Sequence, residues 1–384
     1  MRLWLKTAFC LALTLCVLQG CKGDAGTTPD DVEPTSGGEG EPGAAGDGSE
    51  AETAAEAESP WGATQAEQCK RPARPQMSAR ARSALDDGVR AAAAGDAASA
   101  EASFQSTLKK APDAYEAIYN LGVLADREGD EKKANEYYRR ALGVLPDYEP
   151  AARGLATIAL RSGRTQDAVG EVEPLANAHR ANLEMQALYA EVLVEAKRFD
   201  EAWMAARRAL RCDERFVPAL IALVKASRAQ GRDELADSIL EQAIEVDANV
   251  AELHFLRGEK LKSEPGRLRD AMAAYQRAVE LRPSYAEARM ALGIQLLAGG
   301  NYEGALSHFQ AAEGLVPMLP AVHVNLGDAY RAIRRWSDAQ RAYRRALQLK
   351  SRLPEAHYGL GLLFLTAAGD FPGLDEITAY EKAV

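Results

Sequence analysis

From residue 81 onwards, apolar residues recur three and four positions apart, the spacing of one face of an α-helix. Each apolar stripe ends after about a dozen residues at a Gly or Pro, as at Gly95, Pro112 and Gly129. Glycine ends a helix readily because it adopts a positive φ, and proline cannot continue one. The pattern predicts a succession of short helices joined by tight turns.

The helical pattern repeats every 34 residues. In that register Gly95-Asp96 falls over Gly129-Asp130, Gly163-Arg164, Lys197-Arg198 and Gly231-Arg232, and the register resumes after a one-residue insertion near 263–267. A small residue and a larger one four positions later recur in the same frame, as in Ala100 with Phe104, Ala134 with Tyr138, Ala305 with Phe309, and Ala339 with Tyr343. A period of this length is typical of a solenoid, in which each unit buries its apolar stripe against its neighbours.

The recurring residues resemble the signature of the tetratricopeptide-repeat (TPR) family. The best copies contain Leu121-Gly122 with Ala134, Tyr138 and Pro146, and Leu326-Gly327 with Tyr330, Ala339 and Tyr343. The resemblance implies an all-α fold, an α-solenoid wound as a right-handed superhelix of about eight to nine helix-turn-helix repeats. We expect a linker at 67–80 and a TPR solenoid at 81–384, with repeats near 81–114, 115–148, 149–182, 183–216, 217–250, 251–285, 286–319 and 320–353 and a partial repeat at 354–384.

Three local expectations follow from this register. The glycines at the turns should have positive φ, and Gly122 and Ala134 should lie where helix backbones approach closely, with Tyr138 filling the space beside them. Pro174 falls inside the second helix of the third unit and should shorten or kink that helix.

The beginning of the chain predicts export. Residues 1–20 combine Arg2 and Lys6 with an apolar run that is too short to cross a bilayer, which indicates a signal peptide. Leu18-Gln19-Gly20-Cys21 resembles the lipobox of bacterial lipoproteins, which implies a lipidated Cys21 and a membrane anchor; an ordinary secretory signal is the alternative. Lys22 after the cysteine points by the same resemblance to the outer membrane, facing the periplasm, rather than to the inner membrane.

Residues 21–66 are predicted to be a disordered acidic tether. They are rich in Gly, Ala, Pro and Glu, contain a single aromatic residue, and have no sustained apolar period. This segment contains eleven acidic residues and one basic residue, Lys22, whereas residues 67–384 contain 43 basic and 45 acidic residues. The net charge of −10 therefore belongs to the tether, and the solenoid itself is nearly neutral. A solvated spacer explains this composition; an acidic docking segment is the alternative.

Two cysteines remain after the predicted signal and Cys21. In an oxidising compartment Cys69 and Cys212 could form a disulfide. Cys212 falls, however, where neighbouring repeats place an inward-facing apolar residue, so a buried free thiol is the favoured interpretation.

The residues do not predict catalysis. His254, His323 and His357 occupy one position in their repeats, and such positions lie roughly 10 Å apart, whereas two nitrogens on one zinc ion must lie within about 4 Å. Core histidines are therefore favoured over a metal site. The chain has no glycine-rich phosphate loop, nucleophile elbow or metalloprotease motif. We expect no enzyme activity, no metal or other cofactor, no small-molecule substrate and, because the solenoid is nearly neutral, no nucleic acid.

The geometry of stacked helix pairs instead predicts binding of a peptide or helix in a concave groove formed mainly by the first helix of each unit. By similarity to the family, the groove should be lined by Tyr119, Val123, Arg153, Glu191, Lys225, Arg228, Phe255, Met290, Ile294, Leu297, Arg331, Tyr358, Leu362 and Leu365. The predicted lining contains both charged and apolar residues at its centre and is apolar towards the C-terminal units. For each apolar position, packing between helices is the alternative.

The order of lipobox, acidic tether and TPR body is similar to that of envelope lipoproteins that scaffold machines at the bacterial outer membrane. Within that group, the composition is similar to the TPR lipoprotein of myxobacterial gliding motility. The resemblance implies a scaffold or adaptor that binds other envelope proteins. The alternatives are a pilotin or a factor in outer-membrane protein assembly or secretion and, in a different class, an auxiliary of cell-wall hydrolases.

Overall fold

The computed structural model describes residue 69 and residues 74–367 of the 384-residue chain. The predicted signal peptide, Cys21 and the tether lie outside the described residues. Within the described part there are seventeen helices and no strand. They are α2 (Ala79–Ala93), α3 (Ala97–Lys110), α4 (Tyr115–Arg127), α5 (Glu131–Val144), α6 (Glu149–Arg161), α7 (Thr165–Ala178), α8 (Leu183–Glu195), α9 (Phe199–Leu210), α10 (Val217–Ala229), α11 (Asp233–Val246), α12 (Ala251–Ser263), α13 (Leu268–Leu281), α14 (Ala286–Ala298), α15 (Tyr302–Leu315), α16 (Pro320–Ala332), α17 (Trp336–Leu349) and α18 (Pro354–Thr366).

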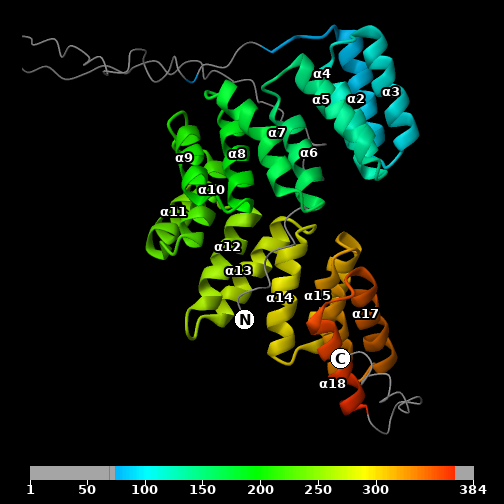
Figure 1. The fold of residues 1–384 in the computed structure, drawn as a ribbon, viewed down its shortest axis with the longest axis vertical. Helices are drawn as coiled ribbons and strands as arrows, with labels where there is room; N and C mark the ends of the chain where they lie inside the picture. Colours follow the sequence, from blue (N-terminus) through cyan, green and yellow to red (C-terminus); the bar gives the residue numbers. More distant parts are fainter. Residues whose placement is uncertain (1–68, 70–73, 368–384) are drawn as a thin grey trace, which may run out of the picture.

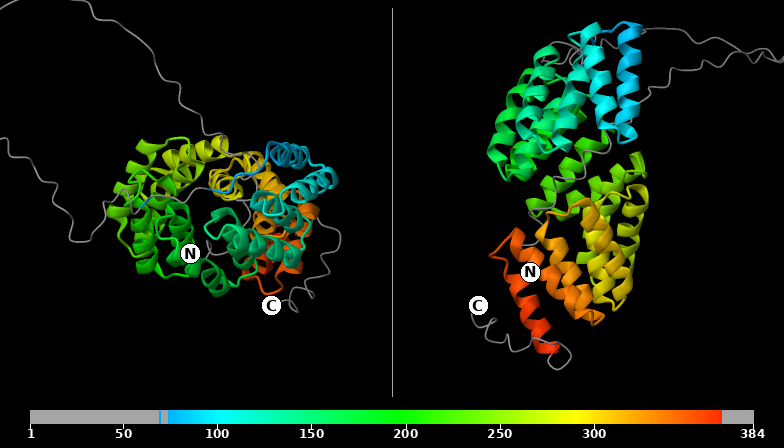
Figure 2. Two further views of the ribbon diagram at one scale, coloured as in Figure 1. Left: turned by 90° about the horizontal axis from the view of Figure 1, so that it is seen from above. Right: turned by 90° about the vertical axis from the view of Figure 1, so that its right-hand side faces the viewer.

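The helices stack as antiparallel pairs in chain order. Each pair, such as α4 with α5 or α16 with α17, packs tightly together, and its second helix packs against the first helix of the next pair. Seen from above, the pairs follow a ring, and the helices α2 and α3 lie over the last units (Figures 1 and 2). The all-α solenoid predicted from the 34-residue period is confirmed.

The turn inside each pair depends on one residue with positive φ. Gly95, Gly129, Gly163 and Gly231 have φ between 72° and 83°, as the sequence predicted. The next residue donates its N–H to a carbonyl five residues back, as Asp96 does to Ala91 over 2.9 Å, which closes the end of the first helix. Two units lack glycine at this turn. In α8–α9 and α16–α17 the positive φ is held by Lys197 (60°) and Arg334 (58°), at a conformational cost that glycine would not have.

Glycines also allow the helices of a pair to approach. A Cβ added to Gly122 would lie 2.7 Å from the Tyr138 ring, and one added to Gly154 of the next unit would lie 2.5 Å from the other side of that ring. Tyr138 is 2% exposed and Ala134 is completely buried. The predicted arrangement of a small residue beside a filling aromatic ring is thus present.

Two local expectations need comment. Helix α7 keeps the 14 residues typical of the second helices although it contains Pro174, so the proline does not shorten it; a kink at Pro174 stays a prediction. Cys212 is not a buried thiol. It lies half-buried in the loop between α9 and α10, and it forms a disulfide with Cys69, which is 143 residues away in sequence. The 34-residue register placed Cys212 at the end of a second helix, but the chain has already left the helix at Leu210.

Candidate protein-binding groove

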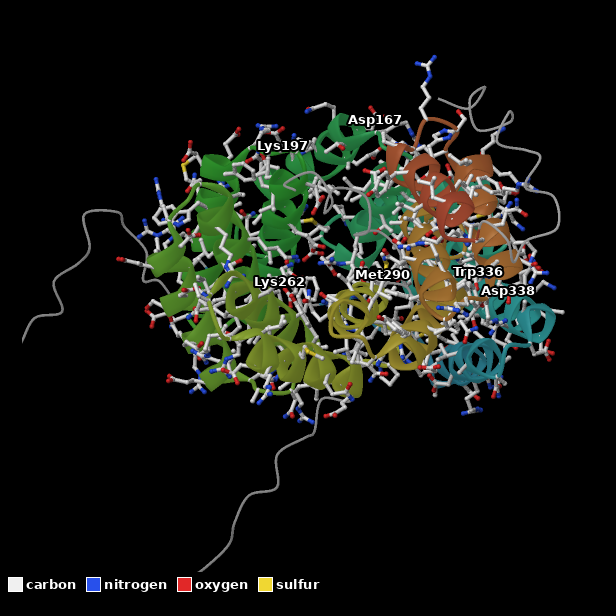
Figure 3. The ribbon with its side chains drawn as sticks, turned by 90° about the horizontal axis from the view of Figure 1, so that it is seen from below. Asp167, Lys197, Lys262, Met290, Trp336 and Asp338 are labelled. Carbon is white, nitrogen blue, oxygen red and sulfur yellow. A yellow bond between two sulfur atoms is a disulfide. The ribbon has the colours of Figure 1, made fainter. Side chains whose placement is uncertain are left out.

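The first helices of the units form the inner wall of the solenoid. They contact one another across units, in the pairs α6 with α8, α8 with α10 and α16 with α18. Successive second helices make no comparably close contacts in the described part of the chain. A curved stack brings its elements closest on the inside of the curve, so the even-numbered helices line the concave face. Figure 3, which looks up along the stack, shows Met290 and Lys262 towards the middle and Asp167 and Lys197 at the outer rim.

Three of the predicted groove residues are core residues. Tyr119, Val123 and Phe255 are only 5 to 7% exposed. The Tyr119 ring lies 5.6 Å from that of Tyr138, and the Phe255 ring lies 5.9 Å from that of Tyr275. These three side chains therefore pack between helices, which was the alternative that the sequence left open.

The centre of the groove carries a row of paired charges. Arg153 on α6 donates to Glu149 over 2.5 Å and to Glu191 on α8 over 2.7 Å, and Lys225 on α10 pairs with Glu252 on α12. Burial alone would raise the pKa of the Glu191 carboxyl, but the positive charges of Arg153 and Lys225 lower it below the usual value. Burial likewise opposes the charge of Arg153, yet its two carboxylates raise its pKa. Arg153 and Glu191 therefore each favour the charged form of the other.

A hollow of about 600 Å³ lies along this row. Arg153, Glu191, Lys225, Glu252 and Glu287 contribute its charged wall. Apolar residues of α10 and of the loops before α12 and α14 complete it, namely Val217, Pro218, Ile221, Val250 and Tyr285. The hollow therefore combines apolar residues with charges that are largely paired, although Oε2 of Glu287 is buried without a hydrogen-bond partner among the described residues.

Arg228 and Met290 contribute mainly to contacts between helices. Arg228 on α10 donates to the Leu256 carbonyl over 2.8 Å and to Asp237 over 3.3 Å, which ties α10 to α11 and α12. Met290 is half-buried and packs on the core of the α14–α17 region. The Arg228 guanidinium is therefore engaged in contacts inside the solenoid.

A second hollow, of about 760 Å³, lies between the last units. Its lining combines the predicted residues Leu297, Arg331, Tyr358 and Leu362 with Tyr302, Val324, Asn325, Asp328, Ala332, Pro354 and Glu355. Two further predicted residues are open to solvent, Ile294 at 41% and Leu365 at 76% exposed. We name the hollow formed by the lining residues above the C-terminal hollow. Four of the predicted groove residues lie in it, and the other two, Ile294 and Leu365, are exposed on the same first helices.

Asn325 and Tyr302 also line this hollow but are not among the groove residues predicted from the sequence. Asn325 is a buried polar residue on the inner helix α16, and Tyr302 begins α15. A signal for Asn325 was present, since Asn120 occupies the same position of the second unit. Only tertiary packing brings Tyr302 to the groove, because it belongs to a second helix.

The histidines hold loops in place. Nε2 of His254, His323 and His357 lies 2.8, 2.7 and 3.1 Å from the carbonyl oxygen six residues earlier in each case. Each ring thus fixes the turn that precedes its helix, and of the three only His323 is fully buried. In the described residues no group of three or more His, Cys, Asp or Glu side chains is arranged to hold a metal ion. No helix in that part of the chain is long and apolar enough to cross a membrane.

Comparison with protein families now identifies the repeat. Sequence profiles described as the tetratricopeptide repeat match residues 80–150, 127–192 and 264–319, and a TPR repeat profile matches residues 327–366. Together they span more than half of the chain. The chain is a tetratricopeptide-repeat protein. TPR proteins bind peptides or other proteins in their groove, and the fold typically serves as a scaffold without catalysis.

Solved structures agree on the fold. A tetratricopeptide repeat protein from Parabacteroides merdae is 19% identical with a TM-score of 0.51, and the match covers 65% of this chain and 98% of that one. Yeast Tom70 is 14% identical with a TM-score of 0.55, and the match covers 82% of this chain and 70% of Tom70. At these identities the similarity establishes the solenoid alone.

Curated relatives share a stretch of repeats. Human protein O-mannosyl-transferase TMTC1 is 26% identical over 230 residues, which are 58% of this TPR protein and 26% of the relative. Photosystem I assembly protein Ycf3 of Cyanophora paradoxa is 31% identical over 90 residues, 23% of this chain and 52% of the relative. The chain thus spans about a quarter of the first relative and about half of the second, and the similarity does not extend to the whole of either protein.

Proposed function

We propose that this TPR protein is a lipid-anchored adaptor of the bacterial cell envelope, which binds partner polypeptides in its concave groove and turns over no substrate. The observation that carries the proposal is the C-terminal hollow. There the first helices α14 and α18 present Leu297, Tyr358 and Leu362 together in an open concavity. Large apolar side chains grouped on an open concave surface are typical of protein-binding sites.

The disulfide supports an extracytoplasmic location. Cys69 and Cys212 are bonded, and structural disulfides persist in oxidising compartments such as the periplasm. This agrees with the export signal and the lipobox-like Cys21 in the sequence. A flexible tether of about 45 residues has a root-mean-square span of roughly 35 to 40 Å, so the solenoid would be held clear of the membrane surface. We propose the outer membrane, facing the periplasm, because Lys22 follows the lipobox-like Cys21.

We propose that the adaptor is part of the gliding-motility machinery. The support is the similarity in sequence plan to the TPR lipoprotein of the myxobacterial gliding apparatus. Deletion of the gene should abolish gliding while leaving secretin assembly and cell-wall turnover intact. Loss of secretin multimers instead would indicate a pilotin, loss of outer-membrane proteins an assembly or secretion factor, and altered cell-wall turnover an auxiliary of hydrolases.

Crosslinking in living cells tests the adaptor function. A photocrosslinking amino acid at Leu297, on the inner helix α14, should trap a small set of envelope proteins. The matched control is the same amino acid at Met204, which is 55% exposed on the second helix α9. Equal capture at both positions, or none at Leu297, would contradict a binding groove. Cys21→Ser should release the protein from the membrane fraction, and retention there would refute the lipid anchor.

A further inference from the structure

Three arginines gather beside the disulfide, on the edge of the solenoid where one unit passes to the next. Arg208 lies in the last turn of α9, Arg211 caps that helix, and Arg180 lies in the loop between α7 and α8. Helices α7, α8 and α9 pack side by side, and the α7–α8 and α9–α10 loops lie on the same edge because both join a second helix to the next first helix (Figure 1). Cys212 follows Arg211 directly, so its bond to Cys69 lies beside these arginines. We name Arg180, Arg208 and Arg211 the arginine cluster.

Arg208 has no carboxylate partner among the described residues. Burial and the positive charges of Arg180 and Arg211 lower the pKa of Arg208 below its ordinary value, and only the Tyr189 hydroxyl acts in the opposite direction. Its Nε is also buried without a hydrogen-bond partner in that part of the chain. A guanidinium N–H is a donor, and a buried donor without an acceptor keeps the cost of its desolvation. An anionic group among the three guanidinium groups would supply acceptors and offset their mutual repulsion.

The carboxylates close to the cluster along the chain do not supply that anion. They belong to Glu173, Glu184, Asp213 and Glu214, and none of them contributes to the pKa of Arg208. Glu173 on α7 lies 3.6 Å from the guanidinium of Arg198, and Asp213 accepts a hydrogen bond from a backbone N–H of its own loop over 2.9 Å. The counterion of Arg208 must therefore come from outside the described residues.

The chain that leads to Cys69 is strongly acidic. Between Lys22 and Cys69 the sequence contains twelve acidic residues and no basic residue. The disulfide attaches the end of this segment to the loop that carries Arg211, with the Cα atoms of the two cysteines 5.5 Å apart. The eleven residues from Glu58 to Cys69 can extend over up to about 40 Å, so the preceding carboxylates are within reach of the cluster. Covalent attachment raises their effective concentration to about the millimolar range. Charge complementarity and attachment therefore both favour this segment as the occupant.

We propose that the acidic end of the predicted tether, around Glu52, Glu56 and Glu58, docks on the arginine cluster. These carboxylates, which lie outside the described residues, accept hydrogen bonds from the guanidinium groups, including the Nε–H of Arg208. The disulfide and the docked carboxylates together fix the point at which the tether leaves the solenoid. That point is the α9–α10 loop in the middle of the stack rather than the first unit. The inference concerns a different surface from the groove and does not depend on the adaptor function.

Photocrosslinking in the full-length protein in detergent tests the docking. A photocrosslinking amino acid in place of Trp61, three residues after Glu58, is irradiated at low salt, and mass spectrometry after reduction of the disulfide locates the crosslinks. They should concentrate on residues 179–184 and 208–216. Their yield there should fall about 10-fold when either side loses its charges, in the triple variants Glu52→Gln with Glu56→Gln and Glu58→Gln, or Arg180→Gln with Arg208→Gln and Arg211→Gln. Salt at about 1 M should have the same effect, because it screens exposed charges.

Two further variants separate docking from net charge and from mere proximity. The matched control removes three exposed arginines elsewhere, Arg140→Gln, Arg269→Gln and Arg352→Gln, and should leave the yield unchanged. A charge-swapped protein, in which the three cluster arginines become glutamate and the three tether glutamates become lysine, should recover the yield. Thermal unfolding of each variant checks that it is folded.

Three results would overturn the inference. Crosslinks that are insensitive to both triple variants and to salt would mean that the disulfide alone brings Trp61 close. A folded charge-swapped protein that does not recover the yield would exclude pairing between the two sets of charges. The third is flotation of the Cys21→Ser protein with phosphatidylglycerol vesicles that the arginine variant abolishes, while the crosslinks are unchanged in that variant. It would assign the cluster to lipid phosphates instead.

Discussion

The Cys69–Cys212 disulfide should stabilise the first four units strongly. It closes a loop of 143 residues that contains α2 to α9. In the chain-entropy model, closing a loop of that length removes about 17 cal/mol/K from the unfolded chain, or about 5 kcal/mol at 25 °C. Native disulfides commonly deliver somewhat less, so we expect Cys69→Ser with Cys212→Ser to lower the free energy of unfolding by about 3 to 5 kcal/mol. Both cysteines are half-buried, so the serine hydroxyls should be tolerated.

Urea denaturation followed by circular dichroism measures this loss. The oxidised protein and the double variant are compared, and a reductant is added to each. Reductant should lower the midpoint of the oxidised protein and leave that of the double variant unchanged. Hydrogen exchange should show the loss of protection in α2 to α9 but not in α14 to α18, because solenoid units contact only their neighbours. Equal midpoints with and without reductant would refute the argument, since the bridge would then not constrain the unfolded chain.

Three further predictions concern single side chains. Gly154→Ala should destabilise the protein by about 1 to 3 kcal/mol, because the new Cβ would lie 2.5 Å from the Tyr138 ring; Gly143→Ala, which meets nothing within 4 Å, should be neutral or slightly stabilising in the same chemical denaturation. Lys197→Gly should raise the free energy of unfolding by about 1 kcal/mol, since glycine adopts a φ of 60° without strain; a loss of stability would contradict this. Burial raises the pKa of Glu195 above that of the unfolded chain, so its charge destabilises the fold above the raised pKa and this cost disappears as pH falls below the unfolded pKa. Glu195→Gln should therefore stabilise at pH 7 and lose that advantage in acid, as thermal melts across pH would show.

The repeat could be predicted from the sequence because its determinants are local. A glycine every 34 residues fixes where one helix ends, and a small residue four positions before a large one fixes how two helices of a pair fit together. The positive φ of Gly95 and the close approach of Gly122 to Tyr138 follow from these choices alone. Local signals were less informative at Pro174, since α7 keeps its full length with the proline inside it.

The groove was harder to predict, because a position in a repeat does not fix the exposure of its side chain. Tyr119 and Phe255 occupy the same repeat position as Tyr358, yet the first two are 5% and 7% exposed and the third is 67% exposed. The difference comes from the neighbours. Tyr119 and Phe255 each lie against aromatic rings of their own region, whereas Tyr358 stands on the last described helix.

The sequence by itself thus determined the fold class, the number and register of the helices, and the turns, since each depends on residues within one or two units. The tertiary structure decided which inward positions remain open, which charges neutralise one another, and that two cysteines 143 residues apart meet. Those features depend on the curvature of the whole stack. Curvature is the accumulated effect of small rotations at every contact between units, and no single repeat encodes it.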